Sequence, residues 1–326
     1  MFKKILVPVD GSTLSDRVID HVKRLLKHED AEVMFLRVLT GGVPGEQDRL
    51  FMDETETPRA HLQRLMRSLS EQGVRVRSLF SAGDPASQIL TVSERYKPSL
   101  IAMTTHGRSG LQRWLRGSVA ERVLRQTRFP LLLAHPGPSG RNGTENSLFR
   151  RILVPIDEVQ ESLAVLPLVR KFAKLNDSQV RLLHVHGLAP HSALGIEKEQ
   201  KNLRRSFRPQ QLLLENVGLN VELEIRHGVA AAEIINAIEE HQPDLVAMAT
   251  HGRSGPSRWA FGSVAEKVIR HCEFPLLIQR TAKVARDPAT VGEMQKERCD
   301  LETFLKHTQD PFTATEEEEE LPSWTL

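Results

Sequence analysis

The sequence contains only two cysteines, Cys272 and Cys299, among its 326 residues. Two thiols are too few for a disulfide framework or a four-thiolate zinc site. The chain also lacks any apolar run of the ~20 residues that a membrane helix needs. Its first residues lead into a short strand-like segment and not into a secretory leader. We therefore expect a protein of the reducing cytoplasm that has no membrane partner.

A surplus of charge of one sign is missing as well. The sequence has 44 basic and 42 acidic residues, for a formal net charge of +2. Because nucleic-acid binding relies on a large basic surplus, the balance argues against a nucleic-acid partner. The hydrophobic share of 40% and the charged share of 26% are typical of a globular protein. At this length, two domains are expected.

Four sequence blocks occur twice in the same order. The second copy follows the first by 147 residues for the opening block and by 145 residues for the other three. Nearly constant spacing indicates that a whole domain was duplicated. The blocks are ILVPVD at 5–10 and ILVPID at 152–157, THGRSG at 105–110 and 250–255, GSVAE at 117–121 and 262–266, and FPLL at 129–132 and 274–277.

The segments outside the repeat set the expected domain boundaries. A stretch rich in glycine, proline and asparagine lies between the copies and predicts a linker at 138–147. The two domains are then residues 1–137 and 148–282. The remaining tail, 283–326, contains a run of five glutamates at 316–320, whose like charges repel one another. We expect this tail to be partly disordered, and its composition favours a solvated end over a docking peptide.

Short, unbroken apolar runs in the first copy predict strands that are buried on both faces. These runs lie at residues 5–9, 33–36, 100–103 and 131–133. Apolar residues with helical spacing lie between them, at Val18, Val22, Leu25 and Leu26 and at Leu62, Leu65, Met66 and Leu69. The alternation predicts an α/β fold with two repeated open, doubly wound, mostly parallel sheets. Ligands of such sheets bind at the carboxyl ends of the strands, where the loops after Met103 and Met248 lie.

These two loops have features of a phosphate site. Gly107 and Gly110 have no side chains, so their backbone can turn tightly and approach a ligand. Ser118 and Glu121 have the spacing of a capping box, which would start a helix at Gly117. Free amides and the positive end of the helix dipole would then favour an anion such as phosphate.

The second copy repeats this loop, with Gly252 and Gly255 followed by Gly262, Ser263 and Glu266. Arg108 and Arg253 would add charge-assisted contacts to phosphate. An ordinary capped helix after a glycine turn explains the same pattern, and neither GxxxxGK[ST] nor GxGxxG after a strand is present. On the residues alone, both interpretations remain open.

Together the blocks resemble the universal stress protein family, and the chain resembles a tandem member with two such domains. The resemblance covers about 270 residues and implies two five-stranded sheets of the adenine nucleotide alpha-hydrolase-like type. The nucleotide-binding branch of that family has a loop of the form Gly-x-x-Gly, nine residues, then Gly-Ser. Here the first glycine is replaced by Thr104 and by Ala249, whereas the second glycine and the Gly-Ser pair are kept.

The resemblance implies a site for ATP with Mg²⁺ or Mn²⁺ in each copy. An aspartate after the first strand and a backbone position late in the second strand would hold the adenosine. The implied residues of the first site are Asp10, Val38, Met103, Thr104, Gly107, Arg108, Gly110, Gly117, Ser118 and Val119. Those of the second site are Asp157, Val185, Met248, Ala249, Gly252, Arg253, Gly255, Gly262, Ser263 and Val264.

The copies diverge directly after the aspartate. Asp10 is followed by Gly11 and Ser12, which suit a tight turn with Ser12 as a helix cap. Asp157 is followed by Glu158, whose carboxylate should weaken binding of a polyanion. The sequence therefore predicts tighter ATP binding in the first copy.

Other candidate residues support weaker hypotheses. His184 and His186 alternate on a strand-like run near His191, but no further ligand completes a metal site, and surface or strand-end histidines are favoured. His106 and His251 have no evident nucleophile or orienting carboxylate, so no catalytic residue is assigned. Trp114 and Trp259 are expected to be packing anchors, and Cys272 a small buried apolar residue.

Three functions follow from the resemblance. The first is an ATP-binding stress-response regulator that signals to an unidentified protein partner. The second is an interaction scaffold that binds no nucleotide, and the third is a slow ATP hydrolase. Duplication also lets one chain supply both halves of what resembles the homodimer of the family, with the closing strands at 131–133 and 276–278 paired. A homodimer of whole chains is a further option.

Overall fold

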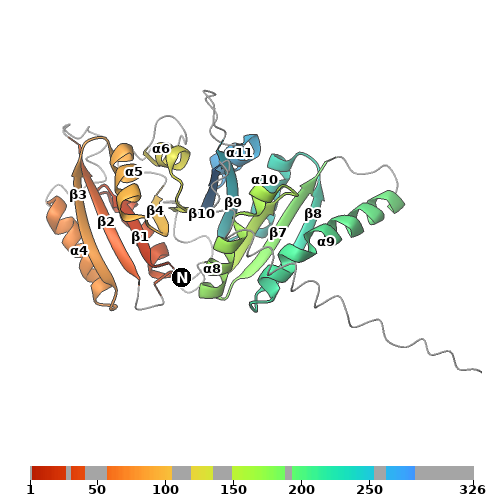
Figure 1. The fold of residues 1–326 in the computed structure, drawn as a ribbon, viewed down its shortest axis with the longest axis horizontal. Helices are drawn as coiled ribbons and strands as arrows, with labels where there is room; N and C mark the ends of the chain where they lie inside the picture. The colour runs from red at the N-terminus through yellow and green to blue at the C-terminus, as the bar shows by residue number, and fades with distance from the viewer. Residues whose placement is uncertain are drawn as a thin grey trace, which may run out of the picture. The chain divides into compact units, whose positions relative to one another are not determined.

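The strands of the computed structural model form one sheet in the order β3-β2-β1-β4-β5-β10-β9-β6-β7-β8 (Figure 1). The structure describes residues 2–26, 31–40, 57–104, 119–134, 149–187, 193–252 and 262–282. These lie within one unit, Met1–Lys283. All neighbouring strands of the sheet run parallel, except β5 and β10, which run antiparallel. The prediction of a mostly parallel α/β fold with two repeats is confirmed.

The first half alternates strands and helices as the apolar pattern predicted. Its elements are β1 (Lys4–Val9), α1 (Thr13–Asp16), α2 (Val18–Lys23), β2 (Glu32–Leu39), α4 (Pro58–Ser70), β3 (Arg75–Ala82), α5 (Pro85–Tyr96), β4 (Leu100–Thr104), α6 (Val119–Gln126) and β5 (Leu131–Ala134). Each of the four apolar runs lies within a strand. The predicted stripe from Val18 to Leu26 is only partly helical, because α2 ends at Lys23 and Leu25 is buried from the turn that follows.

The second half repeats this order of strands. Its elements are β6 (Arg151–Ile156), α7 (Gln160–Leu163), α8 (Leu166–Asn176), β7 (Gln179–His186), α9 (Ala193–Glu215), β8 (Asn220–His227), α10 (Ala230–His241), β9 (Leu245–Gly252), α11 (Ser263–His271) and β10 (Leu276–Ala282). In each half the five strands have the same order, with β1 and β6 in the centre.

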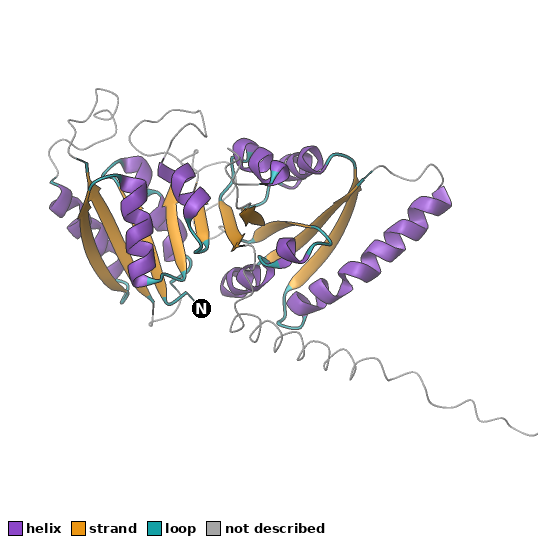
Figure 2. Ribbon diagram, turned by 45° about the horizontal axis from the view of Figure 1, so that its top comes forward, coloured by secondary structure: helices purple, strands orange, loops and turns teal. Residues whose placement is uncertain are grey.

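Helices cover both faces of the sheet (Figure 2), and on each face an apolar layer lies between the helices and the sheet. The first layer packs α2, α4, α8 and α9 against side chains such as Val7 and Val154. The second packs α5, α6, α10 and α11 against Leu6 and Leu153. Since successive residues of a strand point to opposite faces, strands covered on both sides are apolar at every position.

The halves are joined through the pair β5–β10 and through an aromatic cluster. In the pair, Leu131, Leu132 and Leu133 lie opposite Ile278, Leu277 and Leu276. Phe2 from the first half packs edge-on against Phe172 of α8, with ring centroids 5.0 Å apart. All of these side chains are buried, so the joint is part of the hydrophobic core.

Candidate functional site

The order of the strands predicts one ligand crevice in each half. β1 lies between β2 and β4, and the helices after β1 and β2 cover the opposite face from α5 and α6. At such a reversal of chain direction, the carboxyl ends of the two central strands form a ligand crevice. Asp10 directly follows β1, and Met103 and Thr104 end β4. The predicted residues Asp10, Met103 and Thr104 thus lie at the same edge of the sheet, at the carboxyl ends of β1 and β4.

Asp10 is fixed by the turn that follows it. Its Oδ1 accepts hydrogen bonds from the backbone nitrogen of Ser12 at 3.0 Å and from the Ser12 hydroxyl at 2.6 Å. Ser12 Oγ in turn accepts from the backbone nitrogen of Ser15 at 3.1 Å and so caps α1. Gly11 makes the turn possible with φ of +84°, a region that residues with a Cβ avoid. The predicted tight turn with Ser12 as cap is confirmed.

A buried arginine beneath this turn was missed in the sequence. Arg37 of β2 is only 3% exposed, and its guanidinium lies so close to Gly11 that a Cβ there would be 2.2 Å from Nη1. Arg37 directly precedes Val38, the residue expected to contact adenosine. One signal was available: Arg37 is a lone charge that interrupts the apolar run of β2.

The second crevice has the same strands but a different turn. Asp157 follows β6, its side chain is 65% exposed, and its Oδ1 accepts from the backbone nitrogen of Glu158 at 2.8 Å. Glu158 has no positive φ, unlike Gly11. Its carboxylate accepts a hydrogen bond from Ser206 Oγ on α9 at 3.4 Å. The two aspartates are therefore held by different backbone groups.

His184 lies near the end of β7, as one of the two expectations had it, but it is buried and not at the surface. Only 2% of it is exposed, and its ring centroid lies 4.7 Å from that of Phe207 of α9, with the rings tilted by 45°. His186 lies on the same face, with ring centroids 5.8 Å apart. It forms a polar cluster with Glu199 and His227, but no group of three metal-ligating side chains in the described part of the chain is arranged to hold a metal ion.

The glycine loop of the second half starts later than predicted. β9 extends through Ala249 to Gly252, and Gly252 pairs with Ala282 of β10. Gly252 is therefore a strand residue and not the turning residue that the sequence suggested. The reason is that β10 continues to Ala282 and provides a partner for the extra residues of β9.

The helix after this loop begins where expected but without the predicted capping box. Gly262 is the N-cap of α11, Ser263 is its first helical residue, and no side chain caps the helix. Glu266 forms an ion pair with Arg270 at 2.5 Å instead of bonding back to the cap. Glycine is accepted at an N-cap because it adopts the required extended backbone easily. In the first half, α6 starts at Val119, and its cap lies outside the described residues.

Several predicted residues fall in segments that the structure does not describe. Val38 and Val185 are partly buried at matching positions of β2 and β7, and Val119 and Val264 lie in the first turns of α6 and α11. Outside the described residues are Gly107, Arg108, Gly110, Gly117, Ser118, Arg253 and Gly255, together with His106, Trp114, Trp259, the linker 138–147 and the tail.

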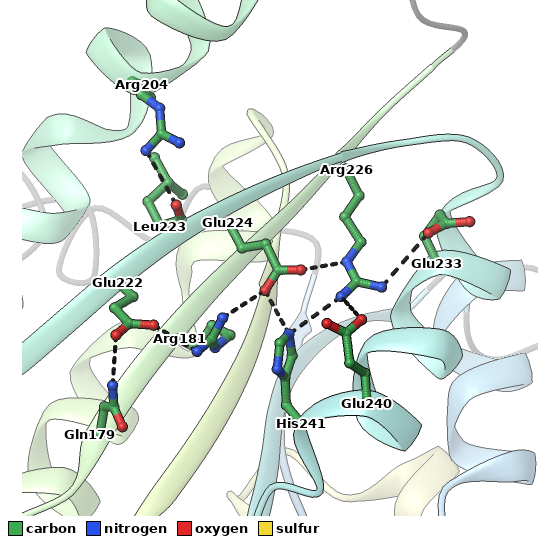
Figure 3. A network of polar contacts seen from close by, with 10 residues as sticks. All are labelled: Gln179, Arg181, Arg204, Glu222, Leu223, Glu224, Arg226, Glu233, Glu240 and His241. Atoms are coloured by element: carbon green, nitrogen blue, oxygen red, sulfur yellow. Dashed lines mark hydrogen bonds and ion pairs between the residues drawn. The ribbon is translucent and has the colours of Figure 1, made fainter.

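A charged network lies on the sheet beneath α10 (Figure 3). Glu224 of β8 accepts from Arg226 Nε at 2.5 Å, Arg181 Nη1 at 3.0 Å and His241 Nε2 at 2.8 Å. Arg226 also donates to Glu240 at 2.6 Å. Burial alone would raise the pKa of Glu224, but the hydrogen bonds from Arg226 and Arg181 outweigh it and lower that pKa below 4.5.

A cavity of about 300 Å³ beside this network is lined by Arg151, Arg181 and His241, at the amino ends of β6 and β7. Each of these basic side chains already has a carboxylate partner: Asp244 for Arg151, Glu222 and Glu224 for Arg181, and Glu224 for His241. The cavity therefore offers paired charges, and it lies away from the carboxyl ends of the strands where the predicted site residues gather.

Two further expectations concern the burial of Cys272 and the presence of membrane-spanning helices. Cys272 is 2% exposed, as predicted, and burial raises the pKa of its thiol to about 12. Such a thiol is inert as a nucleophile near neutral pH. None of the described helices is long and apolar enough to cross a membrane.

Known proteins resemble this chain in sequence and in fold. It is 34% identical over 139 residues to Universal stress protein MJ0531 of Methanocaldococcus jannaschii, a match that covers 41% of this chain and 82% of the relative. It is 32% identical over 148 residues to Universal stress protein YxiE of Bacillus subtilis, covering 41% of this chain and 99% of the relative.

Solved structures match both halves together. The crystal structure of a universal stress protein from Archaeoglobus fulgidus has a TM-score of 0.63 at 22% identity and covers 86% of this chain and 99% of its own. A protein described as a putative universal stress protein from Pseudomonas aeruginosa has a TM-score of 0.64 at 17% identity, covering 86% and 93%. At these identities the likeness shows the fold alone.

The sequence model of the Universal stress protein family matches residues 1–135 and again residues 148–280. Each match covers one copy of the internal repeat and one five-stranded half of the sheet. The chain belongs to the universal stress protein family and carries two copies of its domain in tandem.

Proposed function

We propose that this protein is a cytoplasmic regulator that binds ATP, with Mg²⁺ or Mn²⁺, in the crevice of each half. The observation that carries the proposal is the open N-terminus of α11. Gly262 caps this helix without any side-chain hydrogen bond from the described residues, and a Cβ at Gly262 would meet none of them within 4 Å. No described residue therefore occupies the space next to Gly262.

The amides of this turn are suited to phosphate. Glu266 is the first residue whose backbone nitrogen bonds within the helix, to Gly262 at 3.0 Å. The amides of Ser263, Val264 and Ala265 precede it and have no acceptor in the helix ladder. With the dipole of a nine-residue helix behind them, they favour an anion.

The other groups of each crevice would hold the nucleoside. Asp10 and Asp157 follow the central strands and, as the family resemblance implies, would hold the adenosine together with backbone groups of Val38 and Val185. In this proposal, the divalent cation is brought by the phosphates.

Regulation is favoured over rapid hydrolysis. Neither loop contains a P-loop lysine, and the described crevice residues include no carboxylate or imidazole assigned as a base for water. In this proposal, ATP occupancy controls recognition by a protein partner. A scaffold that binds no nucleotide and a slow hydrolase are the alternatives.

Retained nucleotide distinguishes the three functions. The purified full chain is denatured, and the supernatant is chromatographed for adenine nucleotides, followed by calorimetric titration of the stripped protein with ATP and Mg²⁺. ATP in the supernatant and up to two binding events per chain support the regulator. ADP that forms from added ATP indicates hydrolysis, and the absence of both nucleotide and binding heat would show a scaffold.

A further inference from the structure

The charged network of Figure 3 occupies a place that the first half fills with apolar and aromatic side chains. Arg181 of β7 lies opposite Leu153, and at the same register in the first half Met34 of β2 lies opposite Leu6. Met34 is completely buried. The second half thus has a charge where the first half has a core residue.

Two further positions differ in the same way. Glu224 of β8 corresponds to Leu79 of β3, since each pairs with an equivalent leucine of the neighbouring strand. His241 ends α10 as Tyr96 ends α5, and a residue in the left-handed conformation follows each of them. Leu79 and Tyr96 pack against the apolar layer, whereas Glu224 and His241 bond to each other at 2.8 Å.

The stability of the fold does not account for this difference. The side chains of Glu224, Arg226 and His241 are only 19%, 15% and 21% exposed, so they have lost most of their hydration. Well-packed apolar residues of similar volume often give equal or greater stability than buried ion pairs. The first half forms the same fold with methionine, leucine and tyrosine at the three positions. A function is therefore the better explanation for the charges.

The cavity next to the network supplies space for a ligand. Its volume is about 300 Å³, and it lies where β6 and β7 begin and α10 ends. Charged side chains of both signs line it, because Arg151 and Arg181 contribute guanidinium groups and Glu240 contributes a carboxylate. Its apolar lining residues are Ile152, Leu153 and Pro243.

The carboxylates that bind the two arginines orient them without lining the cavity. Asp244 binds Arg151 at 3.1 Å, and Glu222 and Glu224 bind Arg181 at 2.7 and 3.0 Å. The described residues of the cavity wall include both arginines but none of these three acidic residues. A guanidinium has five N–H donors, and these ion pairs use one or two of them on each arginine. Donors therefore remain for a ligand.

We propose that this cavity binds a small zwitterion of the amino-acid class, with a carboxylate, an ammonium group and an apolar side chain. The carboxylate binds the guanidinium groups of Arg151 and Arg181, whose planar forks match it. The ammonium group binds Glu240 in the last turn of α10, where the helix dipole also favours a cation. The apolar side chain contacts the apolar part of the wall. This site lies at the opposite ends of the strands from the crevices proposed for ATP.

Leucine and two analogues test which charges the site requires. Isocaproate lacks the ammonium group of leucine, and isoamylamine lacks its carboxylate, but both keep the branched apolar body. Saturation-transfer NMR on the full chain without nucleotide, followed by titration, gives a dissociation constant for each compound. Leucine should bind saturably and at least about fivefold more tightly than either analogue, because each analogue loses a charge-assisted contact.

Two neighbouring arginines provide a matched pair of variants. Arg151→Ala should weaken leucine binding about tenfold, through loss of a hydrogen bond between charged groups. Arg150→Ala should leave it unchanged, because Arg150 binds Asp177 and does not line the cavity. The side chains of Arg151 and Arg150 are 46% and 53% exposed, so both variants should fold.

A triple variant gives the second half the side chains of the first. Arg181→Met, Glu224→Leu and His241→Tyr together remove interacting partners at the same time, so no buried charge of the three is left unpaired. The chain should remain folded by circular dichroism and should no longer bind leucine. If the triple variant does not fold, the comparison of Arg151→Ala with Arg150→Ala decides alone.

Lack of saturable leucine binding would overturn the inference, as would isocaproate or isoamylamine binding as tightly as leucine. Equal losses of leucine affinity in Arg151→Ala and Arg150→Ala, or leucine binding that survives in the folded triple variant, would overturn it as well. Because nucleotide is left out, the result does not depend on whether the protein binds ATP.

Discussion

Leu132 of β5 lies directly opposite Leu277 of β10, and neither side chain is exposed to solvent. An unpaired apolar edge strand is a liability for a parallel sheet, because its free backbone groups recruit other chains. In this protein each half covers the edge of the other. Duplication of the domain therefore provides within one chain the contact that a single copy would need a partner to make.

A cross-strand disulfide tests this register. In a Cys299→Ser chain, Leu132→Cys with Leu277→Cys should form an intramolecular disulfide under mild oxidation, because opposite residues of an antiparallel pair have Cα atoms ~4.5–5.5 Å apart. Peptide mapping by mass spectrometry detects the link. The native Cys272 should not compete, since the pKa of its thiol is about 12.

The matched control shifts one cysteine by a single residue. Leu132→Cys with Ile278→Cys places the thiols on opposite faces of the sheet, so no link should form. An efficiently formed disulfide in this control, or no disulfide between residues 132 and 277, would contradict the observed pairing of β5 with β10.

Gly11→Ala should destabilise the protein more than Gly218→Ala. Both glycines have nearly the same positive φ, +84° and +85°, so both alanines carry a backbone cost of ~1–2 kcal/mol. Only at Gly11 does the new Cβ meet the buried guanidinium of Arg37. We expect an additional loss of about 1 kcal/mol in the free energy of unfolding, measured with urea.

Removal of the guanidinium isolates this effect. In an Arg37→Ala chain, Gly11→Ala should cost no more than Gly218→Ala does in the same chain. If Gly11→Ala still lowers the free energy of unfolding more than Gly218→Ala does when Arg37 is absent, then Gly11 and Arg37 are not coupled.

Glu224→Gln should destabilise the protein at neutral pH and weaken its sensitivity to acid. The change removes the charge that accepts hydrogen bonds from Arg226, Arg181 and His241, for an expected loss of about 1–2 kcal/mol. The pKa of Glu224 is lowered in the folded state, so its ionised form contributes stability above the ordinary pKa of 4.5. That contribution is lost as the pH falls from 4.5 through the folded pKa.

Urea unfolding at pH 7 and pH 3.5 measures both effects. The stability difference between variant and parent should shrink at the lower pH. Glu222→Gln is the matched control, because Glu222 is more exposed and binds only Arg181 and Gln179 among the residues of Figure 3. If Glu224→Gln lowers the free energy of unfolding equally at both pH values, the charge of Glu224 does not contribute to stability.

The sequence predicted those strands best that are buried on both faces. β1, β2, β4 and β5 each contain an unbroken apolar run, whereas β3 alternates exposed and partly buried residues from Arg75 to Ala82. β3 is an outer strand of the sheet, so few of its residues need to be apolar. Its sequence therefore contains no apolar run that would have predicted it. Long-range pairing of β5 with β10 followed only from the repeat and the family resemblance.

The candidate site was predictable where it depends on local chemistry. Gly11 and Ser12 predicted the turn correctly, because a positive φ at glycine and a serine helix cap depend only on residues close in sequence. The burial of Arg37 and His184 was not predictable, since it depends on helices that cover β2 and β7 from elsewhere in the chain. The extension of β9 to Gly252 likewise depends on the length of its neighbour β10.

We expect the first site to bind ATP more tightly than the second. In the first, Asp10 is held by Ser12 in a glycine turn. In the second, Asp157 accepts from the backbone nitrogen of Glu158, whose own carboxylate follows directly. An extra carboxylate near a triphosphate costs about 1 kcal/mol, or several-fold in affinity.

The most direct measurement is calorimetric titration of the full chain and two variants with ATP in the presence of Mg²⁺ at one fixed neutral pH. The parent should show two binding events that differ several-fold in affinity. The tighter event should vanish in Gly117→Asp and survive in Gly262→Asp. Equal losses of ATP affinity in the two variants, or a tight binding event that persists in Gly117→Asp, would contradict tighter binding in the first site.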